Sequence, residues 1–217
     1  MATWLSHMRI AEFFMNIDSQ LNCTDFLVGN IAPDCGVPDK DWKNYTPGKR
    51  ITHWQLDGKN IDAENFKETY LIVKDKNFPF YFGYYFHLLT DIAFAKYYSK
   101  VTEQIQTDAE MKQKVTQDYL NQDFVFLRNH PNSIFYTTFA KISEFDNHYL
   151  DFFPKDAFAK RIHHITDNYF AESRHIVSEF PNGYKLDLGL FVSDTIEQLK
   201  EVYSDFPIDW EIMKNKV

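Results

Sequence analysis

The stretch Phe80–Tyr98, which reads FYFGYYFHLLTDIAFAKYY, decides the fold of this chain. Almost every residue in it is aromatic or aliphatic, and only a few small or polar residues interrupt it. A helix that is apolar on all sides belongs in the middle of a bundle, because each of its faces must be covered. The stretch is too short and too interrupted to supply the ~20 apolar residues of a membrane-spanning helix. We therefore predict a central helix of an all-α protein.

The composition of the whole chain agrees with a helical fold. Seven glycines and eight prolines are few for 217 residues, whereas a sandwich or barrel of short strands needs frequent turn residues. Hydrophobic residues make up 44% of the chain, which is typical of a globular protein. We expect a single-domain helical bundle over residues 1–217.

Further helices are predicted on both sides of the central one, from helical spacing of apolar residues and from helix-start signals. They cover Leu5–Ile17, Asp62–Val73, Thr102–Phe126, Ser133–Tyr149, Ala157–Phe180 and Ser193–Tyr203. Between the first two, residues 29–39 are dense in turn formers and predict an ordered loop.

Charge and cysteine content exclude several classes of function. The net charge is -8, with 31 acidic and 23 basic residues, and no basic run offers a grip on nucleic-acid phosphates or on an anionic membrane. Cys23 and Cys35 are the only cysteines, so no disulfide framework is expected. The first residues lack the pattern of a signal peptide. We expect a cytoplasmic protein.

His87 and Asp91 are the strongest candidates for chemistry. Residues four apart lie on one face of a helix, so both side chains can reach one point. An unpaired carboxylate in so apolar a helix costs several kcal/mol, which a divalent cation would remove. An imidazole with a carboxylate suits zinc. The alternative is a His–Asp hydrogen bond in the core, assisted by Thr90.

Three residues elsewhere in the chain can join this pair. His7 falls on the apolar side of the first predicted helix, although a lone His there can be an ordinary core residue. Asp34 follows Pro33 in a restricted loop, which suits a fixed ligand but also a plain turn residue. His53 lies in a loop and can equally be a surface imidazole. Together with His87 and Asp91 they form a mixed nitrogen and oxygen donor set that is appropriate to a hydrolytic zinc site.

Four segments, taken in order, resemble motifs of a known family. They are Thr3–Glu12 (TWLSHMRIAE), Gly29–Asp34 (GNIAPD), Thr52–His53 and Phe82–Asp91 (FGYYFHLLTD). These motifs are similar to those of the bacterial zinc-dependent phospholipase C family, within the phospholipase C / single-strand nuclease superfamily. The similarity covers roughly the first 95 residues, with the motifs in the order of the family. It implies an all-α fold of the phospholipase C / single-strand nuclease type.

The resemblance also implies a zinc site and a mechanism. One zinc would take four ligands, namely Asp34, His53, His87 and Asp91. Asp91 would bridge to a second zinc that also takes His7. The nucleophile would be a hydroxide held by the metals, because zinc lowers the pKa of bound water towards neutrality. Asp34 would orient or deprotonate that water, which makes it the catalytic residue.

The chain departs from the family at its N-terminal end. Secreted members carry a free N-terminal Trp, whose amine and carbonyl complete the shell of the second zinc. Here Trp4 lies inside the chain, and its main-chain nitrogen is an amide. The substitutes that we consider are a main-chain carbonyl near the terminus, a processed Ala2 amine, or water.

The family's third zinc also lacks its usual ligands. The family has a His six residues after the bridging Asp, where this chain has Tyr97. A later His-x-x-x-acid pair is needed as well, and the chain offers His163 with Asp167 and His175 with Glu179. Both pairs can equally be surface ion pairs at helical spacing. We therefore expect two zinc ions rather than three.

The predicted function is hydrolysis of a phosphoester by a zinc-activated water, with a small phosphoester or phospholipid-like molecule as substrate. The alternative is a catalytically inactive, metal-stabilised helical binding or scaffold protein. The presence of Asp34 favours the enzyme, and the missing N-terminal Trp favours the alternative. Another class of helical metal phosphohydrolases needs a His-Asp dipeptide, and none of the eight histidines precedes an Asp. The natural substrate and the oligomeric state stay open.

Overall fold

Helices dominate the structure. In the computed structural model, 65% of the described residues are helical and 2% are in strands, which confirms the all-α prediction. The structure describes residues 1–21, 23–41, 43–55, 57–103, 109–172, 182 and 186–206.

The elements fall into long helices, short helical segments and one small sheet. The long helices are α1 (Trp4–Ile17), α5 (Phe78–Thr102), α6 (Ala109–Asn129) and α10 (Leu188–Ser204). The short α-helices are α2 (Thr24–Gly29), α3 (Lys49–Thr52), α4 (Ala63–Tyr70), α7 (Ile134–Thr137), α8 (Ala157–His163) and α9 (Phe170–Glu172). Two 3-10 turns and one π-helical turn complete them, namely η1 (Ala32–Asp34), η2 (Phe139–Lys141) and η3 (His164–Tyr169). Strand β1 (Val37–Pro38) pairs antiparallel with β2 (Tyr45–Thr46).

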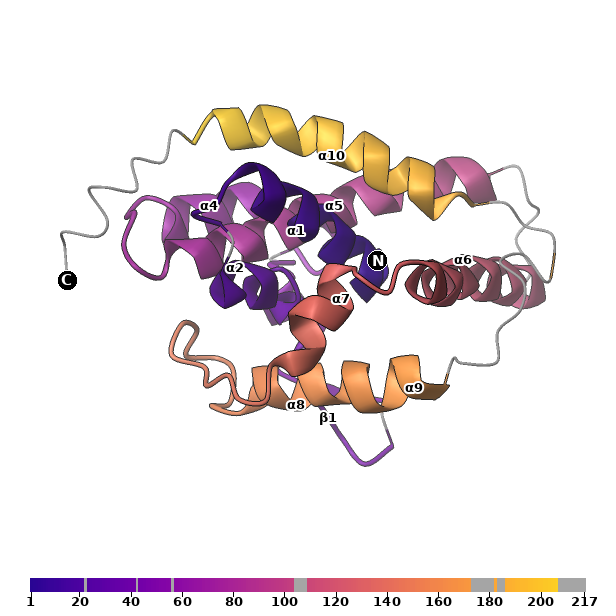
Figure 1. The fold of residues 1–217 in the computed structure, drawn as a ribbon, viewed down its shortest axis with the longest axis horizontal. Helices are drawn as coiled ribbons and strands as arrows, with labels where there is room; N and C mark the ends of the chain where they lie inside the picture. Colours follow the sequence, from indigo (N-terminus) through magenta and orange to yellow (C-terminus); the bar gives the residue numbers. More distant parts are fainter. Residues whose placement is uncertain are drawn as a thin grey trace.

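Helix α5 occupies the centre of the bundle, as its sequence predicts. Pro79 lies in its first turn, where the missing N–H leaves no intrahelical hydrogen bond unmade. The helix contacts α1, α2, α4 and α10. In Figure 1, α10 runs along one side of the molecule and α8 and α9 along the opposite side, with α1 and α2 between them. Other elements therefore cover most of α5 between Phe78 and Asp91, whereas Ala95 in its second half is exposed.

Two glycines allow α2 to pack against α5 at very short range. A Cβ atom at Gly83 would overlap the carbonyl oxygen of Phe26, and one at Gly29 would overlap the carbonyl oxygen of Phe80. Each helix therefore needs a residue without a side chain where it touches the other. The sequence did not predict α2 as a helix. Its close contact with α5 places the next residue, Asn30, beside the middle of α5.

The predicted helix Ser133–Tyr149 is wrong in its second half. Helical structure stops at η2, and the chain then runs without helix to Tyr149. At the end of this segment Asn147 organises the chain instead, because its side chain accepts from the backbone N–H groups of Tyr149 and Leu150 and donates to the carbonyl groups of Leu150 and Phe153. An Asn that bonds the backbone in this way competes with a helix.

Other predicted boundaries shift or fall partly outside the described residues. The predicted helix Ala157–Phe180 is α8, η3 and α9 in succession, and residues 173–180 are outside the described part. Helix α10 begins earlier than predicted, because the Asp187 carboxylate caps it by accepting from the N–H of Leu190 at 2.9 Å.

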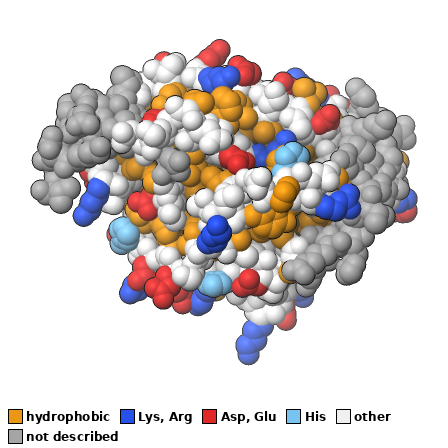
Figure 2. Space-filling view, in the orientation of Figure 1, with side chains coloured by type: hydrophobic (Ala, Val, Ile, Leu, Met, Phe, Trp, Pro, Cys, Tyr) orange, Lys and Arg blue, Asp and Glu red, His pale blue; other side chains and the backbone are white. Residues whose placement is uncertain are grey.

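The surface of the molecule carries charges of both signs. On the face that Figure 2 shows, apolar side chains are visible across the middle, and basic and acidic side chains are interspersed around them. None of the helices within the described residues is both long enough and apolar enough to cross a membrane.

Candidate metal centre

The structure brings all five predicted ligands together. His7 comes from α1, Asp34 from η1, His53 from the residue that ends α3, and His87 and Asp91 from α5. The three histidines and Asp91 are buried, and the side chain of Asp34 is 7% exposed. Segments that are far apart in the sequence thus converge on one point beside the central helix.

His87 is held in a defined orientation. Its Nδ1 lies 2.9 Å from the main-chain carbonyl oxygen of Asn30. A carbonyl oxygen only accepts, so Nδ1 carries the proton and Nε2 presents its lone pair. That Nε2 lies 3.6 Å from Oδ2 of Asp91. This arrangement, with the remote nitrogen donating to a carbonyl group, is the usual support of a metal-bound imidazole. The close packing of α2 against α5, which Gly29 and Gly83 allow, places the carbonyl group of Asn30 there.

His53 is fixed by its neighbour and by α5. Its Nδ1 is hydrogen-bonded to Oγ1 of Thr52 at 2.9 Å, and the hydroxyl group of Tyr84 donates to the carbonyl oxygen of Thr52. The remaining nitrogen, Nε2, lies 3.5 Å from Oδ1 of Asp34 and 3.5 Å from Oδ2 of Asp91. The short helix α3 therefore aims one imidazole nitrogen between two carboxylates.

His7 lies against the other side of the pair. Its ring stacks on that of His87, with the ring centroids 3.8 Å apart, and its Nε2 lies 3.5 Å from Oδ1 of Asp91. Burial is the main cause that lowers the pKa of His7 to about 4, and the neighbouring His87 ring adds to the shift. At neutral pH the ring is uncharged, and it can offer a lone pair to a cation.

Asp91 lies at the centre of the group. Its Oδ1 accepts the backbone N–H of Ala2 at 2.8 Å and faces His7, whereas its Oδ2 faces His53 and His87. Burial alone raises the pKa of this carboxyl group, but the surrounding imidazoles lower it well below its usual value. The carboxylate is ionised, and its two oxygens are directed at different histidines, as a bridging ligand requires.

The donor set fits a metal ion. Four buried atoms that point into the cluster have no hydrogen-bond partner among the described residues, namely Nε2 of His7, Nε2 of His53, Nε2 of His87 and Oδ2 of Asp91. Buried polar atoms without a partner are costly, and one cation among them would satisfy several at once. Two groups of ligand atoms lie within 4.8 Å of one another, one formed by His7, His87 and Asp91 and the other by Asp34, His53 and His87. Imidazole nitrogens with carboxylate oxygens are donors that zinc accepts.

Trp4 has a position that sequence reasoning missed. Its indole N–H donates to Oδ2 of Asp34 at 2.9 Å, which leaves Oδ1 of Asp34 towards His53. Trp4 precedes His7 by three positions, so helical spacing places the two residues on one face of α1. That spacing was the available signal in the sequence.

The remaining candidate ligands lie elsewhere or outside the described residues. Nδ1 of His163 lies 3.4 Å from Oδ2 of Asp167, and both side chains are more than half exposed, as expected of a surface ion pair. The hydroxyl group of Tyr97 donates to the carbonyl oxygen of Asp187, where α10 begins. His175 and Glu179 fall in residues that the structure does not describe.

Asp123 on α6 is another buried carboxyl group, and the sequence did not single it out. Neither of its oxygens has a hydrogen-bond partner in the part of the chain that the structure describes. Burial raises its pKa from 3.8 to about 7, against the opposing effects of Thr3 and Arg9. The folded protein therefore holds a proton at Asp123 at pH values where the unfolded chain has lost it.

The variant Asp123→Asn tests this protonation through stability. Because the folded pKa lies above the unfolded one, this group reduces stability progressively as the pH rises from about 4 to about 7. Between pH 5 and pH 7 the free energy of unfolding of the parent protein should lose on the order of 2 kcal/mol from this group. Asn keeps the shape and does not titrate, so the variant should gain that amount relative to the parent over the same interval. Urea unfolding at both pH values measures it, and an unchanged difference between the two proteins would show that Asp123 is ionised in the fold.

Comparison of the chain with protein-family models finds no match, and searches of curated proteins and of solved structures find none either. The resemblance to zinc-dependent phospholipases C thus stays a prediction from the residues themselves. The functional conclusion rests on the geometry of the cluster and on the space beside it.

Proposed function

We propose that this chain is a zinc-dependent hydrolase that cleaves a phosphoester, and that His7, Asp34, His53, His87 and Asp91 hold the metal. The observation that carries the proposal is the convergence of four unpartnered buried ligand atoms on one point. The resemblance of roughly the first 95 residues to zinc-dependent phospholipases C supports the choice of zinc and of a phosphoester.

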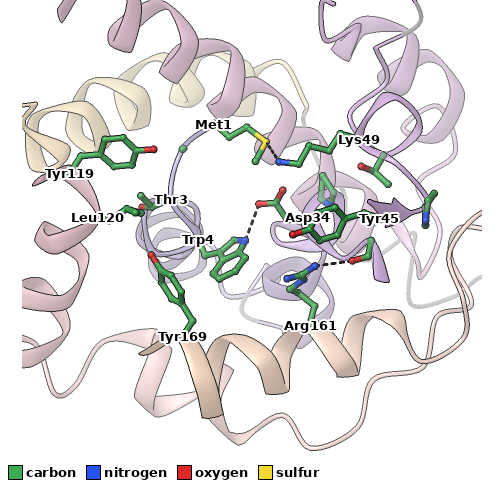
Figure 3. A pocket seen from close by; sticks show the side chains of 15 residues that line it. Met1, Thr3, Trp4, Asp34, Tyr45, Lys49, Tyr119, Leu120, Arg161 and Tyr169 are labelled. Carbon is green, nitrogen blue, oxygen red and sulfur yellow. Dashed lines mark hydrogen bonds between the residues drawn. The ribbon is translucent and has the colours of Figure 1, made fainter. Parts of the chain in front are cut away.

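A pocket of about 380 Å³ lies beside the cluster. Ala2, Asp34 and Thr52 belong both to the pocket wall and to the surroundings of the ligands. Figure 3 shows Asp34 and Trp4 side by side at this cavity, joined by their hydrogen bond. The volume is within the range of pockets that take small ligands. A small substrate in this pocket would lie next to Asp34.

Asp34 is suited to accept a proton in this position. Burial raises the pKa of its carboxyl group, but the nearby imidazoles of His53 and His87 lower it below the usual range. The group is ionised at neutral pH, with Oδ2 held by the indole N–H of Trp4 and Oδ1 directed into the cluster. Zinc, when bound, supplies an activated water and positive charge for the phosphoryl oxygens. Asp34 would orient that water or take its proton.

The alternative of a metal-stabilised scaffold without catalysis shares the ligand cluster. It does not account for a pocket that reaches Asp34, since a purely structural metal site is closed to substrate. A phospholipid-like substrate and a cytoplasmic location belong to the same proposal and stay predictions.

Metal analysis combined with an activity assay separates these readings. The purified protein would be supplemented with zinc, analysed for metal content, and assayed on a chromogenic phosphodiester and a chromogenic phosphomonoester with and without a chelator. We expect bound zinc and hydrolysis of at least one ester, abolished by the chelator and restored by zinc. Bound zinc without hydrolysis would support the scaffold, and failure to bind zinc would contradict both readings.

The variant Trp4→Phe tests whether the indole N–H of Trp4 helps Asp34 to act in catalysis. Phe keeps an aromatic ring and removes the indole N–H, so Oδ2 of Asp34 loses its donor. Loss of a hydrogen bond to a charged group is worth about 1.5–3 kcal/mol, so kcat should fall about 10- to 100-fold while zinc content is retained. The matched control is Trp54→Phe, because the indole nitrogen of Trp54 has no partner among the described residues. Equal kcat values for the two variants would contradict a role of Trp4.

A further inference from the structure

Arg161 on α8 is a buried cation at the wall of the pocket. Only 5% of the residue is exposed, and its Nη2 donates to the carbonyl oxygen of Gly36 at 2.8 Å. No carboxylate of the described residues forms an ion pair with it. A guanidinium group carries five N–H donors, so one carbonyl group leaves most of them available. Burying a charge without a counter-ion is costly, which indicates that a further partner belongs here.

Aromatic rings position this guanidinium group without neutralising it. Its central carbon lies 5.5 Å from the ring centroid of Trp4 and 5.7 Å from that of Tyr45. Such contacts stabilise a cation by less than it costs to bury the cation unpaired. Figure 3 shows Arg161 reaching from α8 towards Tyr45 and Trp4, with Asp34 across the same cavity.

The charges that line the pocket favour an anion. Its wall contains two cations, Arg161 and Lys49, and one carboxylate, Asp34. That carboxylate already accepts the indole N–H of Trp4 and faces His53. The chain as a whole carries a net charge of -8, so the excess of basic over acidic side chains in this pocket is opposite in sign to the net charge of the protein. A bound metal would make the contrast larger.

We propose that Arg161 binds the nonbridging oxygens of an anionic phosphoester, and that the organic group of this ester lies against Trp4 and Tyr169. This proposal rests on the proposed function and names the substrate class of the same site. The planar fork of a guanidinium group matches two phosphoryl oxygens at once. Trp4 and Tyr169 meet edge to face, with their ring centroids 4.9 Å apart, and both line the cavity. They offer an aromatic surface to an apolar or aromatic substituent.

Binding of phenylphosphonate tests the proposal without turnover, because its carbon–phosphorus bond resists hydrolysis. Titration calorimetry would compare the zinc-supplemented parent protein with Arg161→Gln, Arg161→Lys and the control Lys160→Gln. Lys160 is the adjacent residue, and its exposed side chain pairs with Asp156 on the surface. We expect Arg161→Gln to weaken binding at least ~10-fold, by loss of charge-assisted hydrogen bonds. Arg161→Lys should give an intermediate loss, because it keeps the charge but not the fork, and Lys160→Gln should bind as the parent does.

Two further readouts exclude a merely structural role. Thermal unfolding of each variant establishes that it is folded, and Arg161→Lys still carries the test if Arg161→Gln does not fold. On a chromogenic phosphoester, Arg161→Lys should raise KM more than it lowers kcat. Parent-like affinity of a folded Arg161→Gln, or equal losses in Lys160→Gln, would overturn the proposal. If the Arg161 variants lose phosphonate binding but the parent protein hydrolyses no ester, the proposed function is refuted and the anion site stands. Hydrolysis of an ester with an unchanged KM in the folded Arg161 variants would refute the anion site and leave the proposed function standing.

Discussion

Replacement of Asp91 by Asn is expected to abolish metal binding and to reduce phosphoester hydrolysis by roughly 10³-fold or more. The carboxylate directs Oδ1 at His7 and Oδ2 at His53 and His87, so it serves both groups of ligands. An amide offers a single oxygen, and its NH₂ group would donate to an imidazole lone pair that the metal needs. Several kcal/mol of stabilisation by a metal ion correspond to this loss of rate.

The shape of Asn allows this variant to fold. Its amide oxygen can still accept the backbone N–H of Ala2, which lies 2.8 Å from Oδ1 in the parent protein. The variant also removes a buried charge, so without metal it should unfold at a temperature no lower than the parent protein does. Metal content, hydrolysis and thermal unfolding should be measured together. Asp146→Asn is the control, because Asp146 forms an exposed pair with Lys155 that contributes little to stability. Full zinc content in Asp91→Asn would contradict the assigned ligand set.

The variant Gly83→Ala is expected to destabilise the fold by about 3 kcal/mol or more. The new Cβ would overlap the carbonyl oxygen of Phe26 and would lie 2.9 Å from the backbone nitrogen of Asn30. Both neighbours are main-chain atoms of the α2 region, so relief requires α2 to move away from α5. Overpacking of a dense core costs about 1–3 kcal/mol, and more when backbone must shift. The same movement would withdraw the carbonyl group of Asn30 from His87, so zinc affinity should fall with stability.

A second glycine provides the control for this substitution. At Gly48 a Cβ would meet nothing closer than the carbonyl oxygen of Tyr45 at 3.6 Å, which is an ordinary contact. Gly48→Ala should therefore change the free energy of unfolding by much less than Gly83→Ala. Urea unfolding of both variants provides the comparison. Equal stabilities would show that α2 and α5 are not in contact through this glycine.

The central helix was predictable because its signal is local. An apolar stretch that runs around all faces of a helix needs no partner to be recognised, and the spacing of His87 and Asp91 fixes their common face. His7 could be placed on the correct side of α1 for the same reason. These expectations depend on helical periodicity, which the sequence carries directly.

The rest of the site depends on contacts between distant segments. Asp34 and His53 lie in turns without periodicity, so only the resemblance indicated that they meet the helical ligands. Nothing in the sequence indicates that the carbonyl group of Asn30 would meet His87, because that contact requires α2 to pack at the range that Gly83 permits. Arg161 reaches the pocket through the placement of α8 beside β1, which no local pattern specifies.

The incorrectly predicted helix Ser133–Tyr149 shows a second limit of prediction from local sequence. Its apolar spacing suits a helix, yet Asn147 organises the chain through four hydrogen bonds between its side chain and the backbone. Tyr149 at the end of this segment packs in the core without helical structure, because it stacks on Phe80 with ring centroids 3.9 Å apart. Burial of aromatic rings and helix formation are separate events, and periodicity alone does not distinguish them.

Anomalous diffraction at the zinc absorption edge, from crystals of the zinc-supplemented protein, tests the assigned metal centre most directly. We expect an anomalous peak among the five side chains, with Nε2 of His53 or His87 and an oxygen of Asp91 at ~2.0–2.2 Å. A second peak on the His7 side of Asp91 would agree with a two-metal site. Zinc located only at other residues, or no anomalous peak in a fully supplemented crystal, would contradict the assignment.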